Sequence, residues 1–174
     1  MMSGYAKVFP DWLKSWMDSH NISLWGAADL REFRAKALAA SDRTDIHHIK
    51  GDFPHKTAAT RAGLGWIGRH CQLITRKFGP WIRLGTVFTD MELPCGPPAE
   101  NEHCGRCTQC VDACPARALK GAAWYPGLAR EEILDARACD AWKKKHYFQF
   151  HKGHNCGICS AVCPYGLKTL KRKS

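Results

Sequence analysis

The chain has 174 residues, of which 45% are hydrophobic and 24% charged, and its net charge is +10. This balance excludes a disordered chain, and no apolar run approaches the ~18 residues that a membrane-spanning helix needs. The first residues form no apolar signal-peptide segment, so we expect a cytoplasmic protein without membrane contact. Because the cytosol keeps thiols reduced, ten cysteines in such a protein indicate metal or redox chemistry rather than disulfides.

The first part of the chain predicts short helices separated by polar segments. Residues 10–20 carry apolar side chains at helical spacing, and Pro10 suits the first turn of a helix. Four further elements are expected before Gly63: a strand at 22–25, a helix at 29–38, an irregular stretch at 41–53 and a helix at 55–62.

A β-hairpin is predicted in the middle of the chain. Residues 72–75 and 81–88 are rich in β-branched, aliphatic and aromatic residues, and Phe78-Gly79-Pro80 between them is a turn sequence. The glycines of residues 63–68 fit neither a P-loop nor a dinucleotide fingerprint, and they predict a tight turn with close backbone packing. Residues 91–103, rich in proline, are expected to link two halves of the chain.

The strongest motif begins at Cys104. Residues 104–115 read Cys-Gly-Arg-Cys-Thr-Gln-Cys-Val-Asp-Ala-Cys-Pro, which is the C-x2-C-x2-C-x3-C-P run of bacterial ferredoxins. Three thiolates at intervals of three residues bind one 4Fe-4S cluster, and the fourth, Cys114, faces away and ligates the other cluster.

A second run, Cys156-Gly-Ile-Cys159-Ser-Ala-Val-Cys163-Pro164, matches the first except that Gly153 stands where another thiolate is needed. Cys139 is the only cysteine between the two runs and is the natural donor of the missing ligand. The sequence therefore predicts two 4Fe-4S clusters that exchange one ligand each. Cluster 1 would be held by Cys104, Cys107, Cys110 and Cys163, and cluster 2 by Cys114, Cys139, Cys156 and Cys159.

Other readings of these cysteines explain less. A zinc site leaves the third cysteine and the Cys-Pro pair unexplained, and thioredoxin-like chemistry needs only one C-x-x-C pair. His151 or His154 is the alternative to Cys139, since imidazole replaces thiolate in some iron–sulfur sites. Of the remaining cysteines, Cys71 is expected to be a small buried residue and Cys95 a linker residue without a role.

Together these patterns predict an α+β protein in two domains. Residues 1–95 would form a small part of helices and a hairpin, and residues 96–174 a ferredoxin-like two-cluster domain. The longest helix is expected at 128–145, with acidic residues near its start and lysines at its end, as the helix dipole favours. The second domain should depend on metal for its stability.

Residues 55–174 resemble the epoxyqueuosine reductase family and its shorter double-cluster relatives. The resemblance lies in Ala62-Gly-Leu-Gly-Trp-Ile-Gly68, Phe78-Gly-Pro-Trp81, Leu84-Gly-Thr-Val-Phe-Thr-Asp90 and the two cysteine runs with Cys139 between them. In that family the same eight-cysteine arrangement passes electrons to a cobalamin, which reduces epoxyqueuosine to queuosine in tRNA. The resemblance therefore implies a corrinoid site against the first half of the chain and a tRNA-binding surface nearby.

The chain departs from the family before residue 55. The family's N-terminal half is considerably longer, whereas only 54 residues precede the resembling region here. The family's proton-donating aspartate aligns near Ile49, and neither Asp45 nor Asp52 is in register with it. His55-Lys56 instead follows the pattern of the shorter relatives. We therefore assign no catalytic residues. The resemblance implies cobalamin as a cofactor, and these departures leave its binding open.

The positive charge is concentrated in residues 104–174, which carry 13 lysines and arginines and 5 acidic residues. Two dianionic clusters would lower the net charge of the protein to about +6, so part of this excess offsets them. The remainder fits a solvated surface, or a patch for RNA or an acidic redox partner. In order of preference, the expected functions are an electron-transfer protein serving a redox partner protein, a corrinoid-dependent reductase acting on tRNA, and an RNA-binding protein with structural clusters.

Overall fold

The computed structural model describes residues 10–20, 22–24, 26–28, 44–45, 50–51, 53–99, 102–150 and 156–171. These residues form short helices around two small antiparallel strand pairs. In chain order the elements are α1 (Asp11–Ser19), β1 (Thr44–Asp45), β2 (Lys50–Gly51), α3 (His55–Arg61), β3 (Trp66–Ile67), β4 (Leu73–Ile74), α4 (Gln109–Asp112), α5 (Arg130–Ile133), α6 (Ala136–Tyr147), α7 (Ile158–Ala161) and α8 (Pro164–Lys171).

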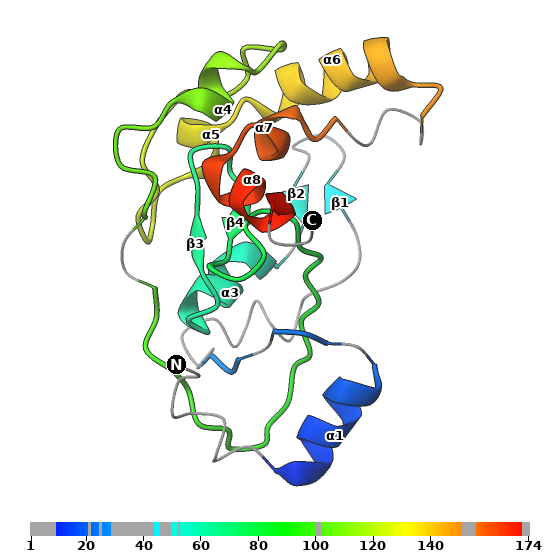
Figure 1. The fold of residues 1–174 in the computed structure, drawn as a ribbon, viewed down its shortest axis with the longest axis vertical. Coiled ribbons are helices and arrows are strands. Elements are labelled where there is room, and N and C mark those ends of the chain that lie inside the picture. The colour runs from blue at the N-terminus through cyan, green and yellow to red at the C-terminus, as the bar shows by residue number, and fades with distance from the viewer. Residues whose placement is uncertain are drawn as a thin grey trace.

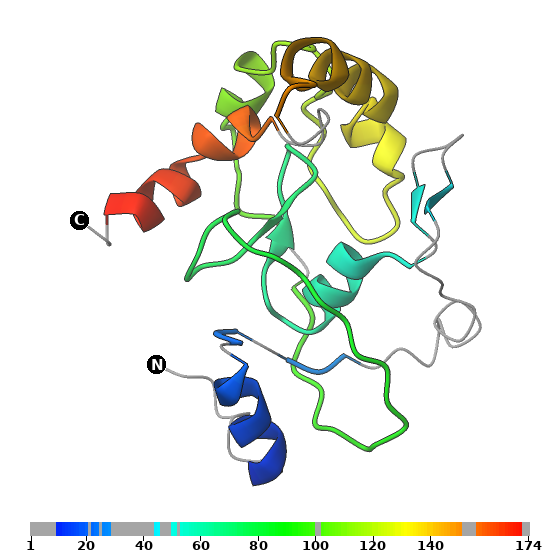
Figure 2. The ribbon, with the colours of Figure 1, turned by 90° about the vertical axis from the view of Figure 1, so that its right-hand side faces the viewer.

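The elements are arranged along the long axis of the molecule (Figure 1). Helices α4 to α8 gather at one end, α3 and the β3–β4 pair lie in the middle, and α1 lies at the opposite end, as the turned view also shows (Figure 2). No helix among the described residues is long and apolar enough to cross a bilayer. The mixed architecture of helices and a small antiparallel hairpin agrees with the predicted α+β class.

The first helices are confirmed, and the polar stretch contains a strand pair that was not predicted. Helix α1 begins after Pro10, and α3 ends before Gly63, whose φ of 69° is left-handed. The stretch at 41–53 was predicted to be irregular, but β1 and β2 pair within it, with Thr44 opposite Gly51. Residues 22–24 form no strand, and the predicted helix at 29–38 lies outside the described residues.

The central hairpin exists, but its predicted partner strand is wrong. Strand β4 pairs with β3, which precedes it, with Trp66 opposite Ile74, and not with residues 81–88. After β4, Thr75 and Gly79 exchange two backbone hydrogen bonds of 2.9 Å, and Pro80 follows without an N–H to donate. The chain therefore leaves the ladder, and residues 81–90 run on without strand pairing.

Close backbone packing joins β3 and β4. A Cβ atom on Gly65 would lie 2.0 Å from the carbonyl oxygen of Ile74, a separation that no side chain permits. The turn between the strands is closed by the Gly68 N–H, which donates to the Gln72 carbonyl at 2.9 Å. The prediction of a tight glycine turn with close packing is thus confirmed, and Gly65 is the residue that requires it.

The helix predicted at 128–145 is divided into α5 and α6. Leu134 between them is extended and forms an isolated bridge with Leu119, which interrupts the helix. Asp135 then caps α6, because its side chain accepts a hydrogen bond of 2.9 Å from the Ala138 N–H. Ile133 at the end of α5 packs with Ile67, Cys71 and Trp124, so a buried core joins the hairpin to the cysteine-bearing segment.

Candidate metal centre

The first cysteine run forms a turn followed by a short helix. The Cys107 N–H donates to the Cys104 carbonyl at 3.0 Å, and Gly105 between them has a left-handed φ of 54°. Helix α4 starts after Thr108, so Cys110 lies in the helix and is buried. Tight turns of this kind bring thiols spaced three residues apart to the same side of the chain.

Four thiols line one small hollow. They are Cys104, Cys107, Cys110 and Cys163, the set predicted for cluster 1, and the other lining residues are His70, Ile74, Pro164 and Tyr165. Cys163 comes from the second run, between α7 and α8, and it reaches the hollow because α7 packs against α4. We refer to these four thiols as the first thiol group.

The remaining four thiols also lie near one another. Burial raises the pKa of Cys139, and the charges of Cys114 and Cys156 raise it further, although Lys143 lowers it. Burial likewise raises the pKa of Cys159, and Cys156, Cys139 and Cys114 add to the rise. The pKa of Cys159 is thus raised by all three of the other thiols, and we refer to the four as the second thiol group, the set predicted for cluster 2.

The chemistry of the first thiol group fits a cationic iron–sulfur core. Burial raises the pKa of Cys104 to about 11 and, aided by the neighbouring thiols, that of Cys110 to about 12. Several thiolates cannot be buried together unless positive charge compensates them, and iron ions would supply that charge. Among the described residues, no three His, Cys, Asp or Glu side chains are arranged to hold a single metal ion. The four thiols of the first group line one hollow instead.

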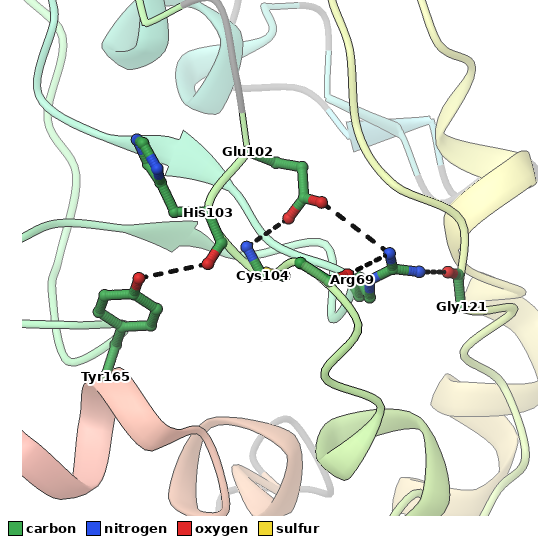
Figure 3. Close-up of polar contacts among 7 residues, drawn as sticks. Arg69, Glu102, His103, Cys104, Gly121 and Tyr165 are labelled. Carbon is green, nitrogen blue, oxygen red and sulfur yellow. Dashed lines mark hydrogen bonds and ion pairs between the residues drawn. The ribbon is translucent and has the colours of Figure 1, made fainter.

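An arginine fixes the loop that carries Cys104 (Figure 3). The Arg69 guanidinium donates to the carbonyl of Gly121 and, at 2.7 Å, to that of Gly105, and it lies 3.9 Å from the Glu102 carboxylate. Glu102 in turn accepts a hydrogen bond of 2.5 Å from the Cys104 N–H. Arg69 therefore ties the turn after β3 to loops on both sides of the first cysteine run.

Aromatic residues join the two runs on the other side of the hollow. The Tyr165 hydroxyl, from α8, donates to the His103 carbonyl at 3.2 Å (Figure 3). The Trp66 ring meets His103 and Tyr165 edge to face, with centroid distances of 4.7 and 4.8 Å. Trp66 also packs in one buried cluster with Ile74 and Cys163, so the hairpin forms a wall of the site.

Sequence reasoning missed this wall. Trp66 was predicted only as part of the glycine turn at residues 63–68, Glu102 only as part of the linker at 91–103, and neither Arg69 nor His70 was given a role. The available signal was Trp66 between the glycines and the pair Arg69-His70 directly after them, at positions where a turn alone needs neither aromatic nor polar side chains. The two cysteines without a predicted role lie outside both thiol groups, since Cys71 is buried in the hairpin core and Cys95 is exposed.

Comparison with known proteins identifies the cysteine-bearing segment as an iron–sulfur domain. Residues 103–166 match the family model described as the 4Fe-4S double cluster binding domain. This match and the curated relatives confirm the predicted cofactors, two 4Fe-4S clusters.

The curated relatives are epoxyqueuosine reductases, which confirms the predicted resemblance. The protein of Pseudomonas aeruginosa is 36% identical over 120 residues, which is 63% of this chain and 31% of that protein. The Xanthomonas campestris protein is 42% identical over 124 residues, again 63% of this chain and 31% of that protein. The Gloeobacter violaceus protein is 34% identical over 150 residues, which is 77% of this chain and 43% of that protein. The chain thus spans between about a third and less than half of the length of these relatives.

Solved structures agree on the fold. A crystal structure of an epoxyqueuosine reductase has a TM-score of 0.51 at 25% identity, covering 91% of this chain and 39% of that protein. The epoxyqueuosine reductase of Streptococcus thermophilus has a TM-score of 0.53 at 22% identity, covering 92% and 41%. A third such structure, with a tRNA-Tyr epoxyqueuosine-modified stem loop, has a TM-score of 0.51 at 23% identity, covering 83% and 40%.

Proposed function

We propose that this chain is an electron-transfer protein of the epoxyqueuosine reductase type, in which eight cysteines ligate two 4Fe-4S clusters. Cys104, Cys107, Cys110 and Cys163 hold cluster 1, and Cys114, Cys139, Cys156 and Cys159 hold cluster 2. Residues 96–174 act as a ferredoxin-like two-cluster domain, and residues 1–95 as a smaller supporting domain. A redox partner protein supplies or accepts the electrons.

The grouping of the thiols is the observation that supports this proposal most strongly. Cys163 lies 49 residues beyond the end of the first cysteine run, at Cys114, yet it lines the same hollow as the run's first three cysteines. Cys114, the last thiol of the first run, instead contributes to the raised pKa of Cys139 and of Cys159 in the other group. This exchange of one thiol per run is the pattern of two-cluster ferredoxins.

The chain's own residues do three things at these sites. The thiolates bind iron, the buried residues around Cys110 and Cys163 limit the access of water, and N–H groups near the sulfurs offset their negative charge. The Ala118 N–H, for example, donates to the Cys114 sulfur at 3.4 Å. When bound, each cluster supplies reversible one-electron transfer.

Anaerobic purification followed by metal analysis tests the proposal. We expect about eight irons and eight sulfides per chain, and two one-electron steps on titration with dithionite. About four irons per chain, or zinc in place of iron, would contradict it.

A second candidate function is a corrinoid-dependent reductase acting on tRNA. The resemblance to epoxyqueuosine reductases, one of which was solved with a tRNA stem loop, supports it. Hydroxocobalamin added to the two-cluster protein should then give a stoichiometric complex with a base-off spectrum, and tRNA should be retained at low salt and released at high salt. No binding of cobalamin at micromolar concentration would remove this candidate and leave the electron-transfer role.

A further inference from the structure

Three buried N–H donors lie beside the first thiol group. Among the described residues, the Trp66 indole nitrogen, Arg69 Nε and His70 Nε2 have no hydrogen-bond partner. The Trp66 and His70 side chains belong to residues that are each only 2% exposed. A buried donor without an acceptor is costly and uncommon in folded proteins, so an acceptor is expected next to these groups.

The surroundings of Trp66 and His70 indicate where that acceptor lies. His70 lines the hollow together with the four thiols of the first group. Trp66 is packed in one buried cluster with Cys163, and Cys104 packs against it. Both side chains are therefore at the wall of the space that the sulfur atoms surround.

The hydrogen bonding of His70 fixes its tautomer. The Gln72 N–H donates to His70 Nδ1 at 3.2 Å, so in the neutral ring the proton is on Nε2. Nε2 is thus a donor, like the indole nitrogen of Trp66. Sulfur carrying negative charge accepts such hydrogen bonds.

We propose that Trp66 and His70 donate hydrogen bonds to the sulfur atoms of cluster 1 and thereby raise its reduction potential. The proposal rests on the two-cluster function above. Reduction adds negative charge to the sulfurs, so donors aimed at them stabilise the reduced state more than the oxidised state. The second thiol group has its own donors, the Ala118 N–H and the Ser160 side chain, so changes at Trp66 and His70 should affect one cluster alone.

Trp66→Phe tests the proposal, because it removes the N–H and keeps an aromatic ring against His103 and Tyr165. Trp124→Phe is the matched control, since Trp124 is also buried but packs in the separate core with Ile67 and Ile133. The measurement is a redox titration of the anaerobic holoprotein, followed by EPR, with dithionite as the electron donor.

In Trp66→Phe one of the two midpoints should become more negative and the other should not move. A tenfold fall in the equilibrium constant for reduction is the expected scale, which is about 59 mV for a one-electron couple. Trp124→Phe should leave both midpoints in place. Equal shifts in the two variants, or no shift in Trp66→Phe, would overturn the role of the indole.

His70 offers a second, independent pair of variants. His70→Leu should lower the same midpoint, and His70→Gln, whose amide N–H can replace Nε2–H, should restore most of it. If both variants shift equally, or neither shifts, His70 is no donor to the cluster.

The wild-type protein gives a measurement that needs no variant. ENDOR spectroscopy of reduced protein in H2O and D2O should detect exchangeable protons coupled to cluster 1, and their absence would contradict the proposal. The iron content distinguishes a failure of the two-cluster function from a failure of the proposed hydrogen bonds. Fewer than about eight irons in the wild-type protein counts against the two-cluster function, whereas eight irons with unmoved midpoints counts against the hydrogen bonds alone.

Discussion

Replacing Gly65 by alanine should destabilise the hairpin that forms a wall of the metal centre. The new Cβ would lie 2.0 Å from the Ile74 carbonyl oxygen and 2.9 Å from its carbonyl carbon. Both atoms belong to the backbone of β4, so no side-chain rotation can relieve the overlap. Strand β3 must move away from β4, and Trp66 and Ile74, which are 2% and 0% exposed, lose packing.

The expected loss of unfolding free energy follows from the clash of the new Cβ with backbone atoms. Overpacking a core typically costs about 1–3 kcal/mol, and a clash with backbone belongs at the upper end, about 3 kcal/mol. For a protein of 150–250 residues, a change of 1 kcal/mol moves the Tm by roughly 2–4 °C, so Gly65→Ala should lower the Tm by roughly 6–12 °C. The first thiol group should lose iron before the second, because Ile74 lines its hollow.

Gly85→Ala is the matched control, because a Cβ at Gly85 meets nothing within 4 Å and Gly85 has no left-handed φ. Thermal unfolding of both holoproteins is followed by far-ultraviolet circular dichroism under anaerobic conditions at one scan rate, with iron content measured beforehand. The Gly85 variant should unfold within about 2 °C of the wild type. If Gly65→Ala unfolds at the same temperature as Gly85→Ala, the close approach of β3 and β4 is wrong.

Three further changes probe other parts of the account. Cys139→Ala should halve the iron content, to about four per chain, and Cys95→Ala should leave it unchanged; eight irons in Cys139→Ala would mean that another residue supplies the ligand. Asp135→Ala removes the cap of α6 and should cost about 1 kcal/mol in denaturant unfolding. Lys144→Ala breaks a partly exposed ion pair with Asp140 and should cost less than about 0.5 kcal/mol, and equal costs would argue against the cap. Arg69→Leu leaves two loop carbonyls without their donor and should speed the loss of iron to a chelator several-fold; an unchanged rate would contradict its positioning role.

The proposed thiol groups follow from the sequence alone because their information is local. A thiolate every three residues followed by Cys-Pro specifies a turn and a short helix by itself, and the gap at Gly153 leaves Cys139 as the one intervening cysteine. Helix α4 packs against α7, and Cys163 lines the same hollow as the first three cysteines of the first run.

The strand pairing could not be predicted in the same way. Residues 81–88 have the composition of a strand, but the mutual hydrogen bonds of Thr75 and Gly79 end the ladder before they can pair. The site wall was missed for a related reason. Trp66, Arg69 and His70 reach the metal centre from strand β3 and the turn that follows it. The partner of Trp66, Tyr165, is far away in the sequence, and so are Glu102 and Gly121, which contact Arg69. Long-range contacts of this kind leave no periodic signal.

A crystal structure of the anaerobic holoprotein with an anomalous difference map at the iron edge tests the central claim most directly. We expect two four-iron sites, each surrounded by four cysteine sulfurs. One should be ligated by Cys104, Cys107, Cys110 and Cys163, and the other by Cys114, Cys139, Cys156 and Cys159. A single iron site, or two sites in which Cys114 and Cys163 each stay with their own run, would contradict it.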